Sequence, residues 1–534
     1  MNRRRSVPLA LLTALLSAGT AQAALIISHD ATKNVTCSGG VCMPTAQNAV
    51  LNTGDLTSML SAGDLTVQTG NGDGTAAGIS IVDGFSWTNT NRLTLDAKKN
   101  IMVKAPVTVA GKGALTMNYN HGNVDGDLLF GAKGKIDFWD LKSSLVISGG
   151  RYTLVGDIKT LAADVSDNPS GMFALANDYD AAADGHYIDS PVKTPFAGTF
   201  EGLAHAVKNL SVSVGPYKTR KRPIGLFAQL EQTGSIRDLQ VIDASVAGFG
   251  TTQYVGAIVG RNYGFIEQVN SSGNMHVQKE SYGGGIAGRN EAGATLALAT
   301  SSAVVHGGRA STIGGLVGEN DGLVHDSVAF GRLTGNYDPL AGGLVGYNTG
   351  QILTSSSHLK IDLTNTVACG GLVGRNAGDI EQSFWTGTVR CQGWPDTSPE
   401  GGLVGDQAGG TVANDYAVGD VTGMASYDVA GGLLGAVSAS ETSASYSVGA
   451  VAAPKAVGAF AGTVHDGAFR RDYWDTDEAG NLSACGTGAC TGIKGLSDAK
   501  LKSELPAGFD PNVWGQNPKI NNGYPYLIAN PPQN

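Results

Sequence analysis

Few residues of this 534-residue chain fall into a pattern that carries chemistry. The sequence holds no His-Glu-x-x-His zinc motif, no phosphate loop ending in Gly-Lys-Ser/Thr and no Gly-x-Ser-x-Gly nucleophile elbow. Its nine histidines are scattered. We therefore predict no catalytic residue, no cofactor-binding residue and no metal ligand, and we expect the protein not to be an enzyme.

Carboxylates are the residues that keep an enzymatic alternative open. Parallel β-helix lyases and hydrolases of polysaccharides place paired carboxylates on one face of adjacent coils, whereas this chain carries its acids irregularly, for example at Glu319, Asp406 and Asp420. Two carboxylates within about 10 Å of each other across a cleft would favour hydrolysis. The alternative function is therefore a carbohydrate-active enzyme, a lyase or hydrolase, on a parallel β-helix.

A second group of acids lies in one segment that we expect to be a solvated insertion. Its members are Asp164, Asp167, Asp178, Asp180, Asp184 and Asp189. The run Asp178-Tyr-Asp180-Ala-Ala-Ala-Asp184-Gly185 is similar to a calcium loop, because Ca²⁺ takes several oxygen ligands, but its spacing is not that of an EF-hand. Calcium binding stays open here.

Six cysteines fall into three pairs, and we predict a disulfide in each. Cys369 and Cys391 bracket one strand-turn-strand return, which brings two Cα atoms within bridging distance. The two pairs of short spacing should be local clips near the two ends. No histidine lies near them, so a zinc site is disfavoured. The short pairs are Cys37 with Cys42 and Cys485 with Cys490.

The first residues have the three parts of a secretory signal: arginines at 3–5, an apolar stretch from Val7 to Leu16 and the tripeptide Ala21-Gln22-Ala23. We expect cleavage after Ala23 and a secreted or outer-surface location. The apolar stretch is too short to span a membrane, and no later segment is apolar enough, so the mature chain should have no transmembrane segment.

The charge balance is acidic and argues against nucleic acid as a partner. The full chain carries a formal charge of −10, and loss of three arginines with residues 1–23 would make it −13. The one basic run, from Lys218 to Arg222, precedes Pro223 and is expected to be a solvated loop.

A repeat organises the second half of the chain. Its closing glycines are spaced by 27 to 31 residues, and they are Gly260, Gly288, Gly318, Gly346, Gly374, Gly405, Gly435 and Gly462. One column of the repeat is always large and apolar, and the column before it is always Gly or Ala. The large column is Ile258, Ile286, Leu316, Leu344, Leu372, Leu403, Leu433 and Phe460. Stacked units would make the large column a buried row, which predicts an all-β parallel solenoid.

Two further columns indicate turns. Asparagine follows the motif in five units, at Asn262, Asn290, Asn320, Asn348 and Asn376, and a glycine comes within three residues. Because Asn tolerates the left-handed conformation, we interpret these residues as a turn ladder with stacked amides. A second glycine, 13 or 14 residues on, appears at Gly273, Gly331, Gly387, Gly419 and Gly449, and it suggests two short strands per unit.

The repeats resemble the GLUG motif of bacterial surface and secreted proteins, which include some adhesins and secreted proteases. Residues 93–119, LTLDAKKNIMVKAPVTVAGKGALTMNY, alternate apolar and polar side chains. They resemble the strand repeats of filamentous haemagglutinin-like proteins, which form right-handed parallel β-helices. The Asn-Pro-Asn type signature that usually accompanies export by an outer-membrane partner is missing from the first hundred residues, so that partner stays open.

Five segments follow from these patterns. They are the signal peptide at 1–23, a cap with haemagglutinin-like strands at 24–150, a transition segment with the acidic loop at 151–223, GLUG repeats at 224–470 and an aromatic-rich C-terminal cap at 471–534. A long surface without a pocket predicts an adhesin-like protein. Its ligand, a host-cell, matrix or carbohydrate component, is not specified by the sequence.

Overall fold

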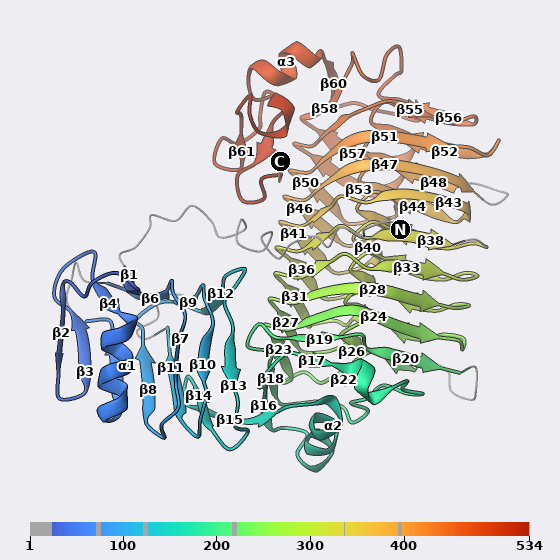
Figure 1. The fold of residues 1–534 in the computed structure, drawn as a ribbon. Coiled ribbons are helices and arrows are strands. Elements are labelled where there is room, and N and C mark those ends of the chain that lie inside the picture. The colour runs from blue at the N-terminus through green and yellow to red at the C-terminus, as the bar shows by residue number, and fades with distance from the viewer. Residues whose placement is uncertain are drawn as a thin grey trace, which may run out of the picture. The chain divides into compact units, whose positions relative to one another are not determined.

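The computed structural model describes residues 24–70, 76–120, 126–215, 222–335, 337–393 and 398–532. The predicted signal peptide and residues 218–221 of the basic run lie outside these ranges. Strands take up 51% of the chain and helices 7%, and stacked parallel coils form a β-solenoid of about 16 turns (Figure 1). The predicted fold class is therefore confirmed.

The chain divides into two compact units. Unit 1 comprises residues 1–179, 198–207 and 236–240, and unit 2 comprises residues 180–197, 208–235 and 241–534. Each unit has its own stack of coils, which Figure 1 shows in blue to cyan for most of unit 1 and in green to red for most of unit 2.

The coils of unit 1 have three faces. The first face is β1 (Ala24–Ser28), β4 (Val50–Asn52), β6 (Gly78–Ile81), β9 (Ile101–Val103) and β12 (Leu128–Phe130). The second is β7 (Phe85–Trp87), β10 (Val107–Val109) and β13 (Ile136–Phe138). The third includes β5 (Leu65–Gln68), β8 (Arg92–Asp96), β11 (Ala114–Asn118) and β14 (Ser144–Ile147). Alternate residues of these strands are buried, as the pattern at 93–119 predicts.

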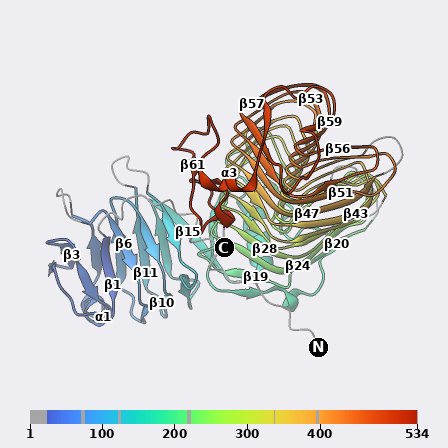
Figure 2. The same cartoon turned by 90° about the horizontal axis from the view of Figure 1, so that it is seen from above.

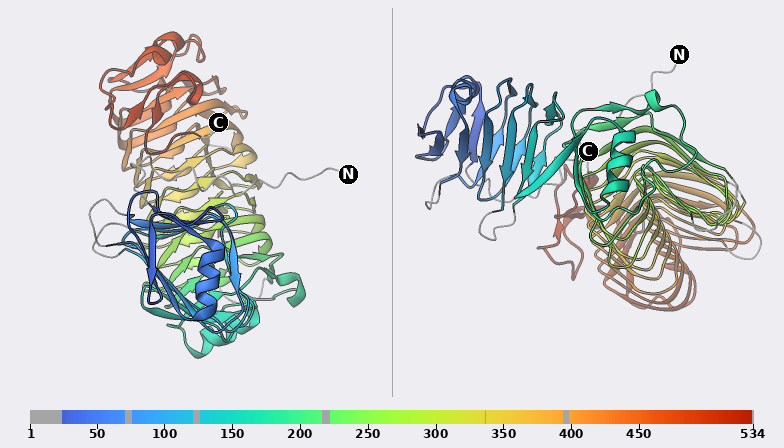
Figure 3. Two further views of the ribbon diagram at one scale, coloured as in Figure 1. Left: turned by 60° about the vertical axis from the view of Figure 1, so that its left-hand side comes forward. Right: turned by 90° about the horizontal axis from the view of Figure 1, so that it is seen from below.

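A helix and a hairpin form the N-terminal end of unit 1. Helix α1 (Thr53–Ala62) begins where the Asn52 side chain accepts hydrogen bonds from the N–H groups of Gly54 and Asp55. Its Leu56 and Leu60 are fully buried in the core of this unit. Strands β2 (Val35–Ser38) and β3 (Val41–Pro44) pair in antiparallel fashion. Figure 3 shows α1 running alongside the strands of the first coils.

The expected acidic loop is partly helical. Asp164 and Asp167 lie in α2 (Ile158–Asp167), whose first N–H groups are capped by the side chain of Asp157. Helix α2 forms because Ile158, Leu161 and Val165 make one buried stripe. A short 3₁₀ helix, η2 (Ala181–Asp184), follows the strand β17 (Tyr179–Asp180).

Each coil of unit 2 also has three faces, not the two strands that the glycine spacing suggested. In one coil, β39 (Leu340–Gly342) lies on face 1, β40 (Val345–Asn348) and β41 (Gln351–Leu353) lie on face 2, and β42 (Ser356–Ser357) and β43 (Lys360–Thr366) lie on face 3. The repeat motif itself contains a corner, because Gly343 and Leu344 separate two strands. Seen along the axis in Figure 2, successive coils superimpose.

Strands of the same face pair in parallel and in register from coil to coil. Face 1 runs through β21 (Pro223–Ile224), β25 (Tyr254–Val255), β29 (Tyr282–Gly283), β34 (Thr312–Gly314), β39, β44 (Ala368–Gly370), β48 (Ser398–Gly401), β52 (Asp428–Gly431) and β56 (Ala456–Gly458). The motif strands of face 2 are β22 (Phe227–Leu230), β26 (Val259–Asn262), β30 (Ala287–Asn290), β35 (Val317–Asn320), β40, β45 (Val373–Asn376), β49 (Val404–Gln407), β53 (Leu434–Ser443) and β57 (Ala461–Arg470).

The large apolar column and the small column of the repeat both lie at the corner between faces 1 and 2. All eight residues of the large apolar column have an exposed fraction of 0%. The small column is required by close approach, since a Cβ atom on Gly371 would lie 2.1 Å from the carbonyl oxygen of Gly402 and 2.3 Å from the Trp385 ring. Larger residues at this column would push coils apart.

The C-terminal segment lies beside the stack instead of covering only its end. Residues Leu501, Phe509, Trp514, Tyr524 and Leu527 pack against an outward row of face 3. That row consists of Phe384, Tyr416, Tyr446 and Tyr473, one from each successive coil. Asn530 donates to the carbonyl oxygen of Ser355, so the segment reaches back over several coils. Figure 2 shows helix α3 (Asp498–Ser503) and β61 (Trp514–Gly515) at the side of the coils.

Candidate functional site

The five predicted asparagines form a continuous amide ladder. Each side-chain N–H₂ donates to the side-chain oxygen of the next coil, at 2.8 Å from Asn262 to Asn290 and 2.7 Å in the following three steps. Gln407 accepts from Asn376 at 3.1 Å and extends the ladder by one coil. All six side chains are buried, so the ladder is internal and cannot contact a ligand.

The left-handed turn predicted for these asparagines is wrong. Each of them ends an extended strand of face 2, and none has a positive φ. Positive φ angles occur instead at the corner between faces 2 and 3, in a column of mixed residue type. Its members are Gln268, Leu298, Asp326, Thr354, Gln382, Asn414, Ala444 and Arg471. The asparagine is selected at its own column because a buried amide can both donate and accept.

A second polar ladder follows that left-handed column. Backbone N–H groups donate to the side-chain oxygen of the next coil, as from Ser327 to Ser355 at 3.2 Å and from Ser355 to Ser383 at 3.1 Å. Asp415 and Asp472 replace serine further on and accept in the same way. Burial raises the pKa of Asp472 to about 8. Sequence inspection did not identify this ladder.

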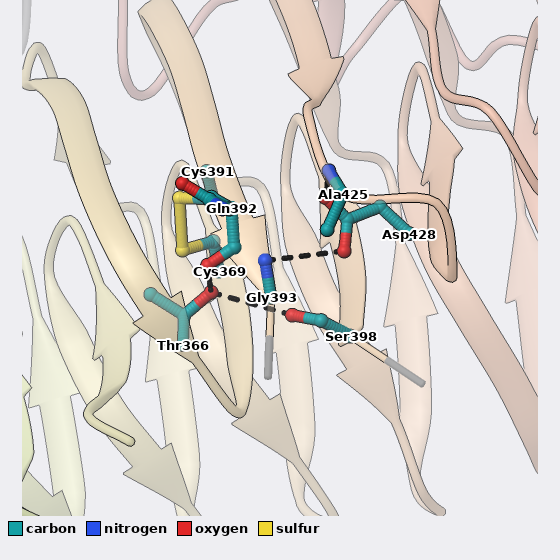
Figure 4. The surroundings of a disulfide bond; sticks show 8 residues. All are labelled: Thr366, Cys369, Cys391, Gln392, Gly393, Ser398, Ala425 and Asp428. Atoms are coloured by element: carbon teal, nitrogen blue, oxygen red, sulfur yellow. Dashed lines mark hydrogen bonds between the residues drawn. A yellow bond between two sulfur atoms is a disulfide. The ribbon is translucent and has the colours of Figure 1, made fainter. Parts of the chain in front are cut away.

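All three predicted disulfides are present. Cys37 and Cys42 face each other across the β2–β3 hairpin. Cys369 and Cys391 join face 1 to face 3 within the repeats, and both are fully buried (Figure 4). The third bond joins Cys485 to Cys490. Three disulfides are typical of proteins that mature outside the reducing cytosol.

Unit 2 carries a strip of tyrosine, arginine and carboxylate side chains where the outer sides of faces 1 and 2 turn toward each other. We call it the Arg–Tyr strip, and its members are Tyr254, Tyr263, Tyr282, Arg261, Arg289, Glu291, Glu319 and Asp321. The ring of Tyr254 stacks on that of Tyr282 with centroids 5.3 Å apart. The guanidinium carbon of Arg261 lies 5.0 Å from the ring centroids of both Tyr254 and Tyr263.

Ion pairs connect the strip from coil to coil. Arg261 binds Glu291, and Arg289 contacts Glu291 at 3.2 Å, Glu319 at 3.3 Å and Asp321. Burial raises the pKa of Glu319 to about 7, against the opposing influence of Arg289. The two arginine side chains keep 23% and 24% of their surface exposed. Tyr254, Glu291 and Glu319 are buried in the strip, and its other members keep partial exposure to solvent.

Arg375 belongs to the column that directly follows the closing glycines, where the residue type varies from coil to coil. Arg375 pairs with Asp406 of the next coil at 2.8 Å, and its side chain is 42% exposed. In the same column Glu319 is only 8% exposed. Two steps of this column, Arg289 to Glu319 and Arg375 to Asp406, are therefore ion pairs between adjacent coils.

Two carboxyl groups do converge in unit 1. Glu201 and Asp238 share a side-chain hydrogen bond, and each is 4% exposed. Burial is the main cause that raises the pKa of Glu201 to about 7, and burial with the neighbouring Glu201 raises that of Asp238. Arg237 lies beside them and binds both oxygens of Asp127 at 2.7 Å. The pair has the composition of an acid–base couple, but it is closed to a substrate in this structure.

A buried histidine belongs to the same unit. His205 is fully buried, and its Nδ1 atom lies 3.2 Å from Asp178 while Nε2 lies 2.8 Å from the carbonyl oxygen of Ile136. Both ring nitrogens are thus engaged, and no nucleophilic side chain is paired with the ring among the contacts described. The histidine ties chain segments together.

The acids of the predicted acidic loop contact protein donors. Asp180 accepts from Asn209 and from the N–H of Ala182, Asp184 accepts from Tyr187, and Asp189 pairs with Arg222. Within the described ranges, no three His, Cys, Asp or Glu side chains are grouped so that they could hold a metal ion. The same ranges contain no helix with the length and apolar character that crossing a membrane requires.

Comparison with known proteins gives similarities in sequence and in structure. The chain is 31% identical over 157 residues to halomucin from Haloquadratum walsbyi (strain DSM 16790 / HBSQ001), a match that covers 29% of this chain and 2% of halomucin. A crystal structure of a Bacteroides ovatus protein named as a candidate immunoglobulin A1 protease superposes with a TM-score of 0.30 at 17% identity, over 71% of this chain and 92% of that one. No family model matches the chain.

Proposed function

We propose that this chain is an exported, adhesin-like protein of the GLUG type with a haemagglutinin-like N-terminal region, and that it binds a macromolecular ligand through the outside of its coils. The Arg–Tyr strip is the observation that carries the proposal. Tyrosine and arginine are the residues that most often dominate binding energy at protein interfaces, and here they line adjacent coils and keep partial exposure.

A binding role also agrees with where the carboxylates lie. Glu201 and Asp238 converge, but both are 4% exposed, whereas a hydrolase needs its two carboxylates on either side of an open cleft. The partly exposed groups of the strip are two tyrosines, two arginines and Asp321, and the arginines are joined to acids in ion pairs. Such a surface provides hydrogen bonds and aromatic faces without a poised nucleophile.

The test is a binding measurement with a matched pair of variants. The purified protein is applied to immobilised host-matrix proteins and glycans, and Tyr263→Ala is compared with Tyr337→Ala. Tyr337 is 58% exposed and lies away from the strip. We expect Tyr263→Ala to weaken binding about tenfold and Tyr337→Ala to leave it unchanged. Equal binding by both variants would place the ligand elsewhere and contradict the proposal for the strip.

A further inference from the structure

Glu400 is a carboxylic acid in an interior column that is otherwise apolar or small. The equivalent residues on other coils are Val255, Gly283, Ile313, Ala341, Cys369, Ala430 and Val457. Glu400 has an exposed fraction of 0%, and within the described part of the chain no donor reaches either of its carboxyl oxygens with hydrogen-bond geometry, although the Ser398 hydroxyl is nearby. A buried carboxylate without a partner is costly, so something else must satisfy it.

A second buried acid lies next to it. Asp428, on the following coil, is also 0% exposed. A Cβ atom on Gly423 would lie 2.8 Å from the Oε2 atom of Glu400 and 2.6 Å from the Cβ of Asp428, so the two side chains meet beside this glycine. Asp428 accepts hydrogen bonds from the N–H groups of Gly393 and Ala425.

Two hydroxyl groups add neutral oxygen atoms to this region. Ser398 is a neighbour of both acids on face 1. It lies two residues before Glu400 on the same strand, and it pairs with Asp428 on the strand of the next coil. Its Oγ atom is 3.3 Å from the Thr366 Oγ1 atom. Figure 4 shows Ser398, Thr366 and Asp428 around Gly393, next to the Cys369–Cys391 disulfide.

Among the described residues, no basic side chain is a cause of the pKa shifts of this pair. Burial and Asp428 raise the pKa of Glu400 to about 10, and the groups that oppose this are only the Ser398 hydroxyl and backbone N–H groups. For Asp428, burial raises the pKa and the opposing groups are again backbone N–H groups. Without a cation, Glu400 holds a proton at neutral pH, because its ionisation in this buried position carries a large desolvation cost.

We propose that Glu400 and Asp428, with the Ser398 hydroxyl, bind a hard divalent cation of the Ca²⁺ type inside the solenoid. Two carboxylates neutralise one divalent cation, and carboxylate and hydroxyl oxygens are the ligands that Ca²⁺ takes. A bound cation would replace the proton of Glu400 and join two adjacent coils directly beside the disulfide. The site is distinct from the acidic segment at residues 164–189.

Calcium binding to the purified full chain tests this. Equilibrium dialysis with Ca²⁺ after chelator treatment gives the number of ions bound, and thermal unfolding gives the shift that Ca²⁺ causes. Glu400→Gln is the test variant, because it keeps the shape and removes the charge. Glu381→Gln is the control, since Glu381 is an exposed acid on the outside of face 2.

We expect Glu400→Gln to bind one Ca²⁺ fewer per chain than the wild type and Glu381→Gln, and to lose the Ca²⁺-dependent rise in Tm. In chelator, Glu400→Gln should be more stable than the wild type. The same stoichiometry and the same Tm shift in all three proteins would overturn the proposal, as would a wild type that binds no Ca²⁺. If Glu400→Gln does not fold, Ser398→Ala replaces it, with Ca²⁺ affinity lowered at least tenfold as the supporting result and unchanged affinity as the contradicting one.

Discussion

The side-chain nitrogen of Asn348 lies 2.7 Å from the side-chain oxygen of Asn376 on the next coil, and both side chains are fully buried. Asn348 in turn accepts from Asn320 at 2.7 Å. Every amide in this row therefore depends on the coil before it and the coil after it. Coils that shifted in register would leave buried donors and acceptors without partners, so the ladder fixes the alignment of neighbouring repeats.

Replacement of one amide should be costly. Asn348→Leu removes the ladder acceptor of Asn320 and the ladder donor to Asn376, and we expect a loss of roughly 2–4 kcal/mol in the free energy of unfolding. Thr349→Ala is the control, because this exposed hydroxyl makes only one bond, to Asp321 at 2.6 Å. It should cost no more than about 0.5 kcal/mol. Urea denaturation followed by circular dichroism measures both, and similar midpoints would contradict the ladder's role.

Substitutions at Leu372, in the large apolar column, and at Arg375, three residues later, should differ strongly in their cost to stability. Leu372 is fully buried, so Leu372→Asp places an unpaired acid in the core and should cost about 3 kcal/mol or more. Arg375→Ala removes a single ion pair of a side chain that is 42% exposed, which should cost at most about 1 kcal/mol. Limited proteolysis locates the damage: new cleavage in the middle repeats is expected for Leu372→Asp only. Equal resistance of the two variants would mean that the column is not buried.

In the central coils, even one added methyl group in the small column should destabilise the protein. Gly371→Ala would place a Cβ 2.1 Å from the carbonyl oxygen of Gly402, and we expect a destabilisation of roughly 1–3 kcal/mol. Gly409→Ala is matched in chemistry, but its Cβ would find its nearest neighbour, the oxygen of Ala377, at 3.8 Å. Thermal unfolding should show a lower Tm for the first variant and an unchanged Tm for the second. A wild-type Tm for Gly371→Ala would show that the coils are spaced more widely.

The Glu201–Asp238 pair should make unit 1 less stable at higher pH. The folded-state pKa of Glu201 is about 7 against an ordinary value of 4.5. Its contribution to stability is therefore complete below about pH 4.5 and is lost as the pH rises through 7. Glu201→Gln stays neutral, so it should raise the Tm at pH 8 relative to the wild type and change it little at pH 4.5. A Tm difference that is the same at both pH values would contradict a buried, protonated Glu201.

Much of the fold could be predicted because stacking repeats the same environment at a fixed interval. Leu344, Leu372 and Leu403 occupy one buried corner, and only large apolar residues fill it. The third face was missed because the face 1 strands are only two to four residues long and most of them, such as Leu340–Gly342, end in a motif glycine. The left-handed column was missed because its members, among them Leu298 and Thr354, share a backbone conformation and no side-chain chemistry.

The polar clusters were harder to predict, with one exception. Glu201 and Asp238 are 37 residues apart in sequence, and the Arg–Tyr strip joins side chains of two faces that approach only after the corner forms. Glu400 is the exception that the sequence alone could have identified, because it is the single charged residue in a column of small and apolar residues. Comparison of every column across the repeats, beyond the most regular ones, would have identified it.

Incubation of the purified protein with polysaccharide, with bound polymer and newly released reducing ends measured on the same sample, tests binding against catalysis most directly. We expect saturable binding that Tyr263→Ala weakens and Tyr337→Ala does not, with no increase in reducing ends or unsaturated products. Product release that Glu201→Gln or another single Asp or Glu substitution abolishes would contradict it, and would identify the chain as a carbohydrate-active enzyme.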